Sequence, residues 1–188
     1  GGGNDWNIPH LKKYHGSKTF LTEALTLEMG MAIEKSVEDK KPFFAYMSHY
    51  AVHCPFEEDS RFTAYYPKLK DNALAFATLV EGIDKSLGDL ITKLDALGVA
   101  EDTLVVFYSD NGSDGPMGNK PLRGKKGTRF EGGTKVPLIV AWAKPNPENK
   151  FQKRLNITAN SIEHDMVTCN DMMPTFLSIA GAKVPNNT

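Results

Sequence analysis

The sequence predicts an α/β fold, because segments with helical periodicity alternate with short apolar runs that are typical of buried strands. Residues 20–41 and 73–98 carry apolar side chains at helical spacing. The runs "DTLVVFYS" (102–109) and "VPLIVAWA" (136–143) are apolar without alternation, which suits a sheet covered on both faces. In such sheets ligands collect at the carboxyl ends of the strands, so the polar residues that follow these runs are the first candidates for a site.

The first half of the chain is expected to contain one helix, one strand and one long loop after a polar, glycine-rich lead-in at residues 1–18. The helix, 20–41, has an apolar residue at every fourth position: Leu21, Leu25, Met29 and Ile33. The run "PFFAYMS" (42–48) is short, apolar and introduced by proline, and it predicts a buried strand. The aromatic-rich stretch 49–71 contains two prolines and is expected to be irregular.

The second half begins with the longest helix. Residues 73–98 form one apolar stripe, and Gly98 suits the position just after the helix end. After the two apolar runs, the polar stretch 144–156 predicts a surface loop. Residues 170–181 predict a short final helix with Asn170 or Asp171 as its cap, Pro174 in the first turn and Gly181 at the end.

The composition is that of an ordinary globular protein, and it excludes two classes of partner. The 22 Lys and Arg nearly balance the 23 Asp and Glu, for a formal net charge of −1, so no global basic field attracts nucleic acid or an anionic membrane. No apolar run approaches the roughly 20 residues that span a bilayer. Cys54 and Cys169 favour two free buried thiols, with one disulfide as the alternative. Because the chain has no internal repeat, residues 1–188 are interpreted as one segment.

Asp110 and Asn111 directly follow the apolar run 102–109. A carboxylate beside an amide supplies two oxygen ligands for a hard cation such as Ca²⁺ or Mg²⁺ with a single negative charge. Gly112 lets the backbone turn sharply after them. The alternative is an ordinary strand-ending turn, in which Asp, Asn and Gly are the commonest residues. Two ligands also leave a Ca²⁺ ion, which takes about 6–8 oxygens, incomplete.

The loop "LRGKKGTRFEGG" (122–133) combines glycines with cationic side chains. Glycines allow backbone amides to approach an anion, and Lys126 supplies a mobile positive charge. The order of a P-loop is absent. His53, in the stretch "HYAVHCPF", is placed to donate a hydrogen bond to an anion or a proton to a leaving group. The alternatives are a solvated basic loop and a histidine with a packing role.

Four segments in this order resemble the sulfatase family of the alkaline-phosphatase-like superfamily: "PFFAYMSHYAVHCPF", "VEGIDKSLGDLITKLDALGVAEDTLVVFYSDNG", "PLRGKKGTRFEGGTKVPLIV" and "NDMMPTFLSIAG". The resemblance covers most of the chain from the first helix onward. It implies part of a mixed sheet flanked by helices, within the C-terminal part of a catalytic domain. Its most specific part is the pair formed by Ser-Asp-Asn-Gly and Leu-Arg-Gly-Lys-Lys-Gly-Thr.

The resemblance also implies roles for four residues. Asp110 and Asn111 match two of the family's calcium ligands, and Asp110 also matches a residue that handles a proton near the sulfate. Lys126 matches the lysine that binds the sulfate group. His53 matches the histidine that contacts sulfate and helps to protonate the departing oxygen. Stabilisation of negative charge on the sulfate oxygens is the work that such a set of residues performs.

The sequence departs from the family pattern where the nucleophile is expected. Family members carry a formylglycine made from Cys or Ser in a Cys/Ser-x-Pro-x-Arg motif, and this motif is absent from the 188 residues. The family's N-terminal aspartate pair and its Gly-Lys-x-His segment are absent too. We therefore expect a fragment that holds half of the metal and sulfate site and is inactive alone, with the formylglycine upstream in a missing N-terminal part of the same protein.

The expected substrate is a sulfated small molecule or a sulfated carbohydrate, and the resemblance implies an exported protein in a periplasmic, lysosomal or extracellular location. Two alternatives stay open. One is a fragment of a related phosphoric or phosphonic ester hydrolase of the same superfamily. The other is a non-catalytic module that binds an anion or a sugar, which the missing nucleophile favours. His53 and Lys126 favour the sulfatase over the phosphatase, because two-metal phosphatases use a second metal where sulfate sites use protein cations.

Overall fold

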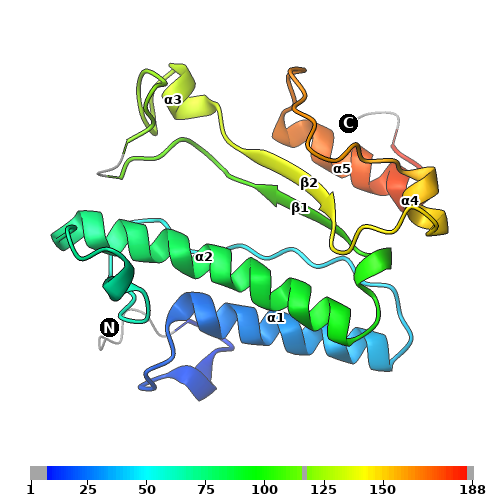
Figure 1. Cartoon of the computed structure of the whole chain (residues 1–188), viewed down its shortest axis with the longest axis horizontal. Coiled ribbons are helices and arrows are strands. Elements are labelled where there is room, and N and C mark those ends of the chain that lie inside the picture. Colours follow the sequence, from blue (N-terminus) through cyan, green and yellow to red (C-terminus); the bar gives the residue numbers. More distant parts are fainter. Residues whose placement is uncertain (1–7, 116–117, 186–188) are drawn as a thin grey trace. The chain divides into compact units, whose positions relative to one another are not determined.

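A computed structural model describes residues 8–115 and 118–185 and divides the chain into two compact units, Gly1–Ile157 and Thr158–Thr188 (Figure 1). The first unit contains the helices α1 to α4, the strands β1 and β2 and all four predicted site residues. The second unit contains helix α5. The predicted lead-in, residues 1–18, lies partly outside the described residues, and its described part includes the short 3-10 helix η2 (Lys12–Tyr14).

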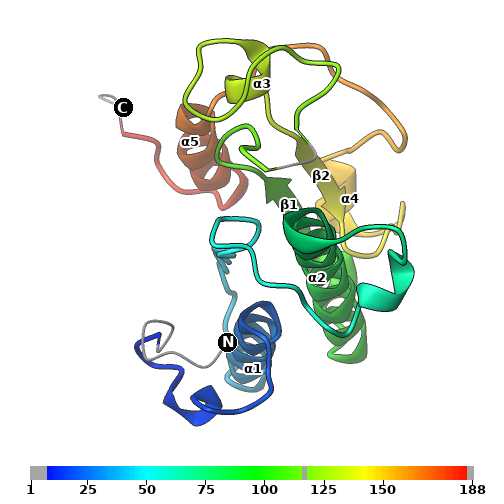
Figure 2. The same ribbon diagram turned by 90° about the vertical axis from the view of Figure 1, so that its left-hand side faces the viewer.

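Two long helices form the core of the first unit. Helix α1 (Leu21–Glu38) and helix α2 (Asp71–Ala96) lie side by side (Figures 1 and 2). Their contact is apolar at one end, where the buried side chains of Ile33, Leu94 and Ala100 form a cluster. Further along, the buried hydroxyl of Thr26 donates to Ser86 Oγ at 2.6 Å, so the polar atoms between the helices are paired. Both helices agree with the predictions from apolar periodicity.

The strands β1 (Leu104–Tyr108) and β2 (Leu138–Trp142) form an antiparallel ribbon. Leu104 pairs with Trp142, and Tyr108 pairs with Leu138. The 3-10 helix η4 (Ala100–Asp102) connects α2 to β1. Because the strands run in opposite directions, the end of β1 and the start of β2 lie together. The whole connection 109–137, which carries Asp110, Asn111 and Lys126, therefore leaves and returns at one end of the ribbon.

The prediction of a strand at 42–48 is wrong for the described chain. The segment is extended, but within residues 8–115 and 118–185 it pairs with no strand, and the side chains of Phe44 and Tyr46 are 73% and 80% exposed. The expected burial of the strands is wrong as well: β1 is half-buried and Ile139 on β2 is exposed. The cause is common to both errors, because an apolar run becomes a buried strand only where neighbouring strands and layers cover it.

The shorter elements also correct two local predictions. The stretch 144–156, expected to be a loop, contains helix α4 (Lys150–Arg154), whose first N–H groups are capped by the Asn149 side chain. In the second unit, α5 (Cys169–Ile179) begins after Thr168 rather than at Asn170 or Asp171. The N–H of Thr168 donates to Asp171 Oδ2 at 2.7 Å in a capping box, and this places Pro174 beyond the first turn.

Removal of the Leu94 side chain tests the core between α1 and α2. Leu94 is 3% exposed, whereas Leu27, on α1, is 48% exposed. We expect Leu94→Ala to lower the free energy of unfolding by about 2–4 kcal/mol, because it removes buried methyl groups and leaves a cavity. Leu27→Ala, the matched control, should cost less than about 1 kcal/mol. Urea denaturation of the 188-residue chain measures both, and equal losses would contradict the packing described here.

Candidate functional site

The chain turns immediately after β1 to present Asp110 and Asn111. The Ser109 N–H donates to the Pro137 carbonyl at 3.3 Å, which extends the ribbon by one contact. Asp110 is exposed and Asn111 is half-buried. The Asn111 N–H donates to Asp110 Oδ1 at 2.8 Å, so one carboxylate oxygen binds the backbone of the next residue. The second carboxylate oxygen and the Asn111 side-chain oxygen are the two candidate cation ligands.

The turn after Asn111 contacts the glycine-rich loop closely through backbone atoms. The Gly112 N–H donates to the Gly133 carbonyl at 3.0 Å. A Cβ atom at Gly112 would overlap the Gly132 carbonyl, and a Cβ atom at Gly132 would overlap the Gly124 carbonyl. Glycine is therefore required at these positions, because no side chain fits between backbones that approach so closely. Gly132 and Gly133 belong to the short helix α3 (Glu131–Thr134), which directly precedes β2.

Backbone contacts between the same two loops also position Lys126. Its backbone N–H donates to the Ser113 carbonyl at 3.3 Å, and the flanking residue Gly127 has a φ of +80°. The loop thus brings Lys126 to the turn that follows Asp110 and Asn111. In the structure these three predicted site residues lie on two loops in direct contact, and their roles stay a prediction.

The two neighbouring lysines of this loop differ in their partners. Lys125 Nζ lies 2.6 Å from Asp114 Oδ1, and this hydrogen bond, with the charge of the same lysine, lowers the pKa of Asp114. In the described part of the chain, Lys126 has no carboxylate within ion-pair distance. Lys126 also contributes to the lowered pKa of Asp114, but only as a more distant charge. Lys126 is therefore the lysine whose charge is available to an external anion.

His53 lies on the irregular segment between α1 and α2. Its side chain is exposed, and its Nδ1 lies 2.7 Å from the Cys54 carbonyl oxygen. A carbonyl accepts hydrogen bonds and cannot donate them, so this contact assigns a proton to Nδ1. The other ring nitrogen, Nε2, is not used in this contact. The ring of Tyr50 lies 5.5 Å away, centroid to centroid, at a tilt of 58°.

The segment of His53 and the loop of Asp110 both contact the side chain of Phe76 on α2. The ring of Phe56 packs edge-on against Phe76 at 5.8 Å, and Gly115 lies so close that a Cβ atom there would overlap the Phe76 ring. Figures 1 and 2 show the cyan segment near residue 53 and the green chain that leaves β1 at the same end of α2. Among the described residues, no hydrogen bond or ion pair joins the His53 side chain to the other three, so its convergence with them stays a prediction.

The donor set is consistent with a hard cation, but it is too small to complete one. The candidate ligands are oxygens, as Ca²⁺ and Mg²⁺ require. Within residues 8–115 and 118–185, however, no group of three or more His, Cys, Asp or Glu residues is placed to hold a metal ion. Asp110 and Asn111 are therefore the two candidate ligands, and the other positions around a cation are left to further groups.

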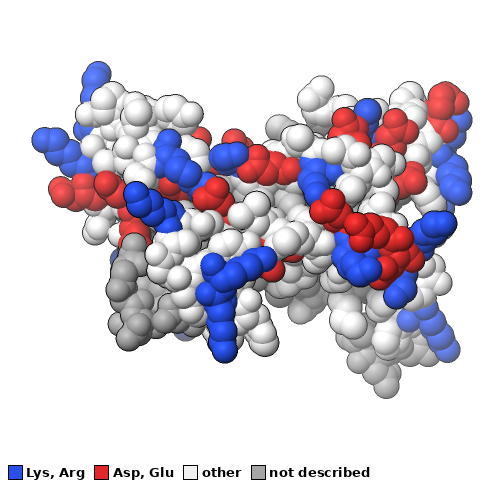
Figure 3. Space-filling model, turned by 90° about the horizontal axis from the view of Figure 1, so that it is seen from below, with Lys and Arg blue, Asp and Glu red and all other residues white. Residues whose placement is uncertain are grey.

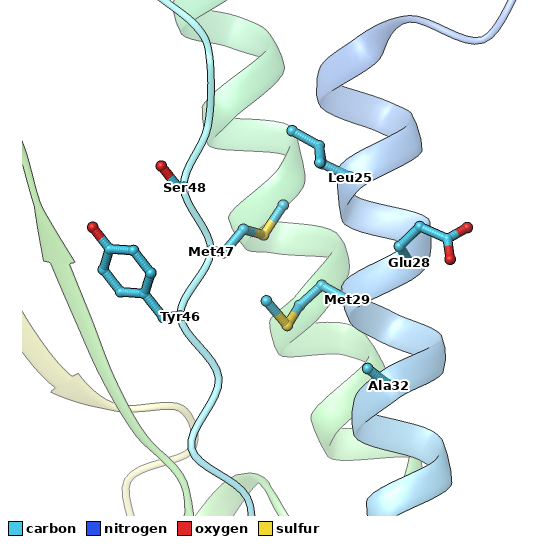
Figure 4. A pocket seen from close by; sticks show the side chains of 7 residues that line it. All are labelled: Leu25, Glu28, Met29, Ala32, Tyr46, Met47 and Ser48. Carbon is cyan, nitrogen blue, oxygen red and sulfur yellow. The ribbon is translucent and has the colours of Figure 1, made fainter. Parts of the chain in front are cut away.

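Two other features of the first unit are separate from this site. A cavity of about 260 Å³ lies between α1 and the extended segment at 46–48, and Figure 4 shows its lining, which is mostly apolar: Leu25, Glu28, Met29, Ala32, Tyr46, Met47 and Ser48. Its one carboxylate binds Lys13 and Tyr14. Figure 3 shows acidic and basic side chains interspersed over the face seen from below, with no basic field. Neither feature offers a second anion site.

Three polar residues with unusual surroundings carry no recognisable signal in the sequence. The Nδ1 atom of His49 is buried without a hydrogen-bond partner in the described chain, and burial lowers the pKa of this histidine. Ser113 and Asn119 bind each other across the base of the connection between β1 and β2. The two cysteines are free, as expected, but both are exposed rather than buried.

The helices, the antiparallel ribbon and the two connected loops define an α/β protein of the alkaline-phosphatase-like class, which confirms the predicted fold class. The model of the sulfatase family matches residues 3–182, and the chain belongs to that family.

Relatives of known sequence or structure agree with this assignment. A protein of Formosa agariphila described as a sulfatase is 35% identical over 98% of this chain and 33% of its own length. The N-acetylgalactosamine-6-sulfatase of Mus musculus is 30% identical over 89% of this chain and 30% of its own. The crystal structure of Ps i-CgsB in complex with k-i-k-neocarrahexaose superposes with a TM-score of 0.78 at 32% identity, over 89% of this chain and 36% of that one. The chain thus spans about a third of the length of these relatives.

Substitution of Gly112 tests the backbone contact between the two loops. We expect Gly112→Ala to lower the free energy of unfolding by about 1–3 kcal/mol, because the added Cβ atom displaces the Gly132 carbonyl. Gly88→Ala is the matched control: nothing lies within 4 Å of its Cβ position inside α2, and the change should stabilise the chain by about 0.5–1 kcal/mol. If urea denaturation gives the same sign for both variants, the described contact is absent.

Proposed function

We propose that the chain forms part of the catalytic domain of a sulfatase that hydrolyses sulfate esters, and that it carries half of the metal and sulfate site. The observation that supports this most directly is the backbone contact between the two loops in a member of the sulfatase family. That contact joins the loop of a carboxylate–amide pair to the loop of a lysine that has no ion-pair partner in the described chain, and it supports a shared site. A pair of oxygen ligands next to a free ammonium group is suited to a cation and an anion bound together.

Asp110 and Asn111 would hold the cation in this proposal. Ca²⁺ is the preferred ion, with Mg²⁺ as the alternative, because both bind carboxylate and amide oxygens. A bound cation supplies charge stabilisation to the oxygens of the sulfate group. The remaining ligands have to come from residues outside the described site, since Asp110 and Asn111 satisfy only a fraction of the roughly 6–8 positions around Ca²⁺.

Lys126 and His53 would bind the sulfate group itself. The Lys126 ammonium binds a non-bridging oxygen and offsets the charge that develops there. His53 carries a proton on Nδ1 and has Nε2 directed elsewhere, so a protonated ring donates from Nε2 to the ester oxygen as it leaves. Asp110 is the chain's candidate for moving a proton near the attacked group. These roles use residues on different segments, which the contacts at Phe76 hold at one end of α2.

The sulfated substrate is proposed to be a carbohydrate. The related Ps i-CgsB binds k-i-k-neocarrahexaose, and a second relative is an N-acetylgalactosamine-6-sulfatase, so saccharide recognition recurs among the relatives of this chain. An exported location accords with such substrates. No described helix combines the length and the apolar character needed to cross a membrane.

The purified 188-residue chain is expected to be inactive towards an aryl sulfate. Its sequence contains no Cys/Ser-x-Pro-x-Arg motif, and we propose that the formylglycine nucleophile is provided by an N-terminal part of the same protein. Without a nucleophile, charge stabilisation alone leaves the ester intact. Release of the phenol by the purified chain, if Lys126→Ala abolished it, would show that the chain holds a complete site and would overturn the half-site proposal.

Adjacent lysines provide the sharpest test of the sulfate-binding role. In the full-length protein, Lys126→Ala should lower kcat/KM for an aryl sulfate by about 10²–10³-fold, as loss of a group that stabilises developing charge does. Lys125→Ala removes the same charge one residue away, but Lys125 pairs with Asp114, so its effect should stay within about threefold. Aryl phosphate, assayed in parallel, distinguishes a sulfatase from a phosphoric ester hydrolase. Equal losses in the two variants would contradict the assignment of Lys126.

A further inference from the structure

The side chain of Asn119 lies half-buried between the loop of Asp110 and the loop of Lys126. Its oxygen accepts from the Ser113 N–H at 2.8 Å, and its nitrogen donates to the carbonyls of Ser113 at 2.7 Å and Gly124 at 3.3 Å. One amide group thus binds both backbone groups of Ser113, in the manner of a neighbouring strand. Such a pair of bonds fixes the orientation of Ser113 as well as its position.

Ser113, on the loop of Asp110, is bonded both to Asn119 and to the loop of Lys126. Its carbonyl accepts from Asn119 and also from the Lys126 N–H, at 3.3 Å. Its position in the chain is two residues after Asn111. Any displacement of Ser113 therefore changes the separation between the Asp110–Asn111 pair and Lys126.

Bond lengths indicate that Asn119 is the stronger of the two partners of Ser113. The Lys126 bond, at 3.3 Å, lies beyond the usual range of about 2.7–3.2 Å for N–H···O bonds, whereas two of the three Asn119 bonds lie well within it. The described residues between Gly112 and α3 form no helix or strand that would hold them independently. The Asn119 bonds therefore fix Ser113, to which the Lys126 N–H is bonded, and they act beside the ion pair of Lys125 and Asp114.

We propose that Asn119 is a positioning residue that sets the distance between the cation-binding pair and the sulfate-binding lysine, acting through Ser113. The nature of the two bound ions rests on the proposed function, whereas the mechanical link between the loops does not. Asn119 itself touches neither ion. An amide is required because Ser113 offers one donor and one acceptor, which an aspartate or an alanine cannot both satisfy.

Amide hydrogen exchange of the 188-residue chain tests the link without any assumption about activity. In Asn119→Ala, the Lys126 N–H should exchange at least about tenfold faster than in the native chain, because the carbonyl that it binds is no longer held. Asn149→Ala is the matched control, since the Asn149 side chain also makes three hydrogen bonds but caps α4. That variant should leave exchange at Lys126 unchanged. Equal exchange in Asn119→Ala and the native chain would overturn the proposal.

A kinetic test in the full-length protein separates positioning from a general loss of stability. Asn119→Ala should lower kcat/KM for an aryl sulfate by about 10–100-fold, as loss of an indirect support for a binding group does. In a Lys126→Ala background the same change should cost less than about threefold, because the group that it positions is gone. Asn119→Gln, which keeps the amide, should recover part of the activity. Losses that add fully in the double variant would overturn the positioning role.

The two tests fail in different ways. If the native full-length protein does not turn over sulfate esters, the proposed function is wrong, and the exchange experiment still decides whether Asn119 holds Lys126. If the protein is active but Asn119→Ala is as active as the native enzyme with normal exchange at Lys126, the function stands and the inference about Asn119 is wrong. The urea midpoint of each variant shows that folded protein is compared in both.

Discussion

The contact between the backbones of Gly112 and the Gly132–Gly133 pair is the constraint on which the site depends. It follows from the antiparallel ribbon, which brings the end of β1 and the start of β2 to one place. The turn after β1 and the short helix before β2 then approach so closely that no side chain fits between their backbones. Glycine satisfies this at each position, and the contact in turn places a carboxylate–amide pair beside a cationic loop.

The charges around this contact are arranged so that one lysine stays available. Asp114 binds Lys125, and one oxygen of Asp110 accepts from the Asn111 N–H; in the described chain neither carboxylate pairs with Lys126. His53, Asp110 and Lys126 are exposed in the described chain, where solvent weakens their electrostatic interactions. Their full electrostatic effect requires the exclusion of water, and about two thirds of the length of the related proteins lies outside the matched region.

The sequence predicted those features that depend on local chemistry. Long apolar stripes identified α1 and α2, and polar residues after a strand identified Asp110 and Asn111. The extended segment at 42–48 was predicted wrongly as a strand because strand formation depends on a partner that its own residues do not reveal. Asn119 was missed for a similar reason: its importance lies in hydrogen bonds to residues of another loop, and an Asn in a glycine-rich stretch is otherwise an ordinary turn residue.

His53 differs from the other site residues in how its position is determined. Asp110, Asn111 and Lys126 are related through backbone hydrogen bonds, which fix distances closely. The segment of His53 is related to them through aromatic contact, since Phe56 and Gly115 meet on the ring of Phe76. Aromatic rings tolerate shifts that a hydrogen bond does not, because dispersion varies slowly with direction. The loop of Lys126 is thus joined to the turn after Asn111 by directional hydrogen bonds, whereas the segment of His53 is related to that turn through packing against Phe76.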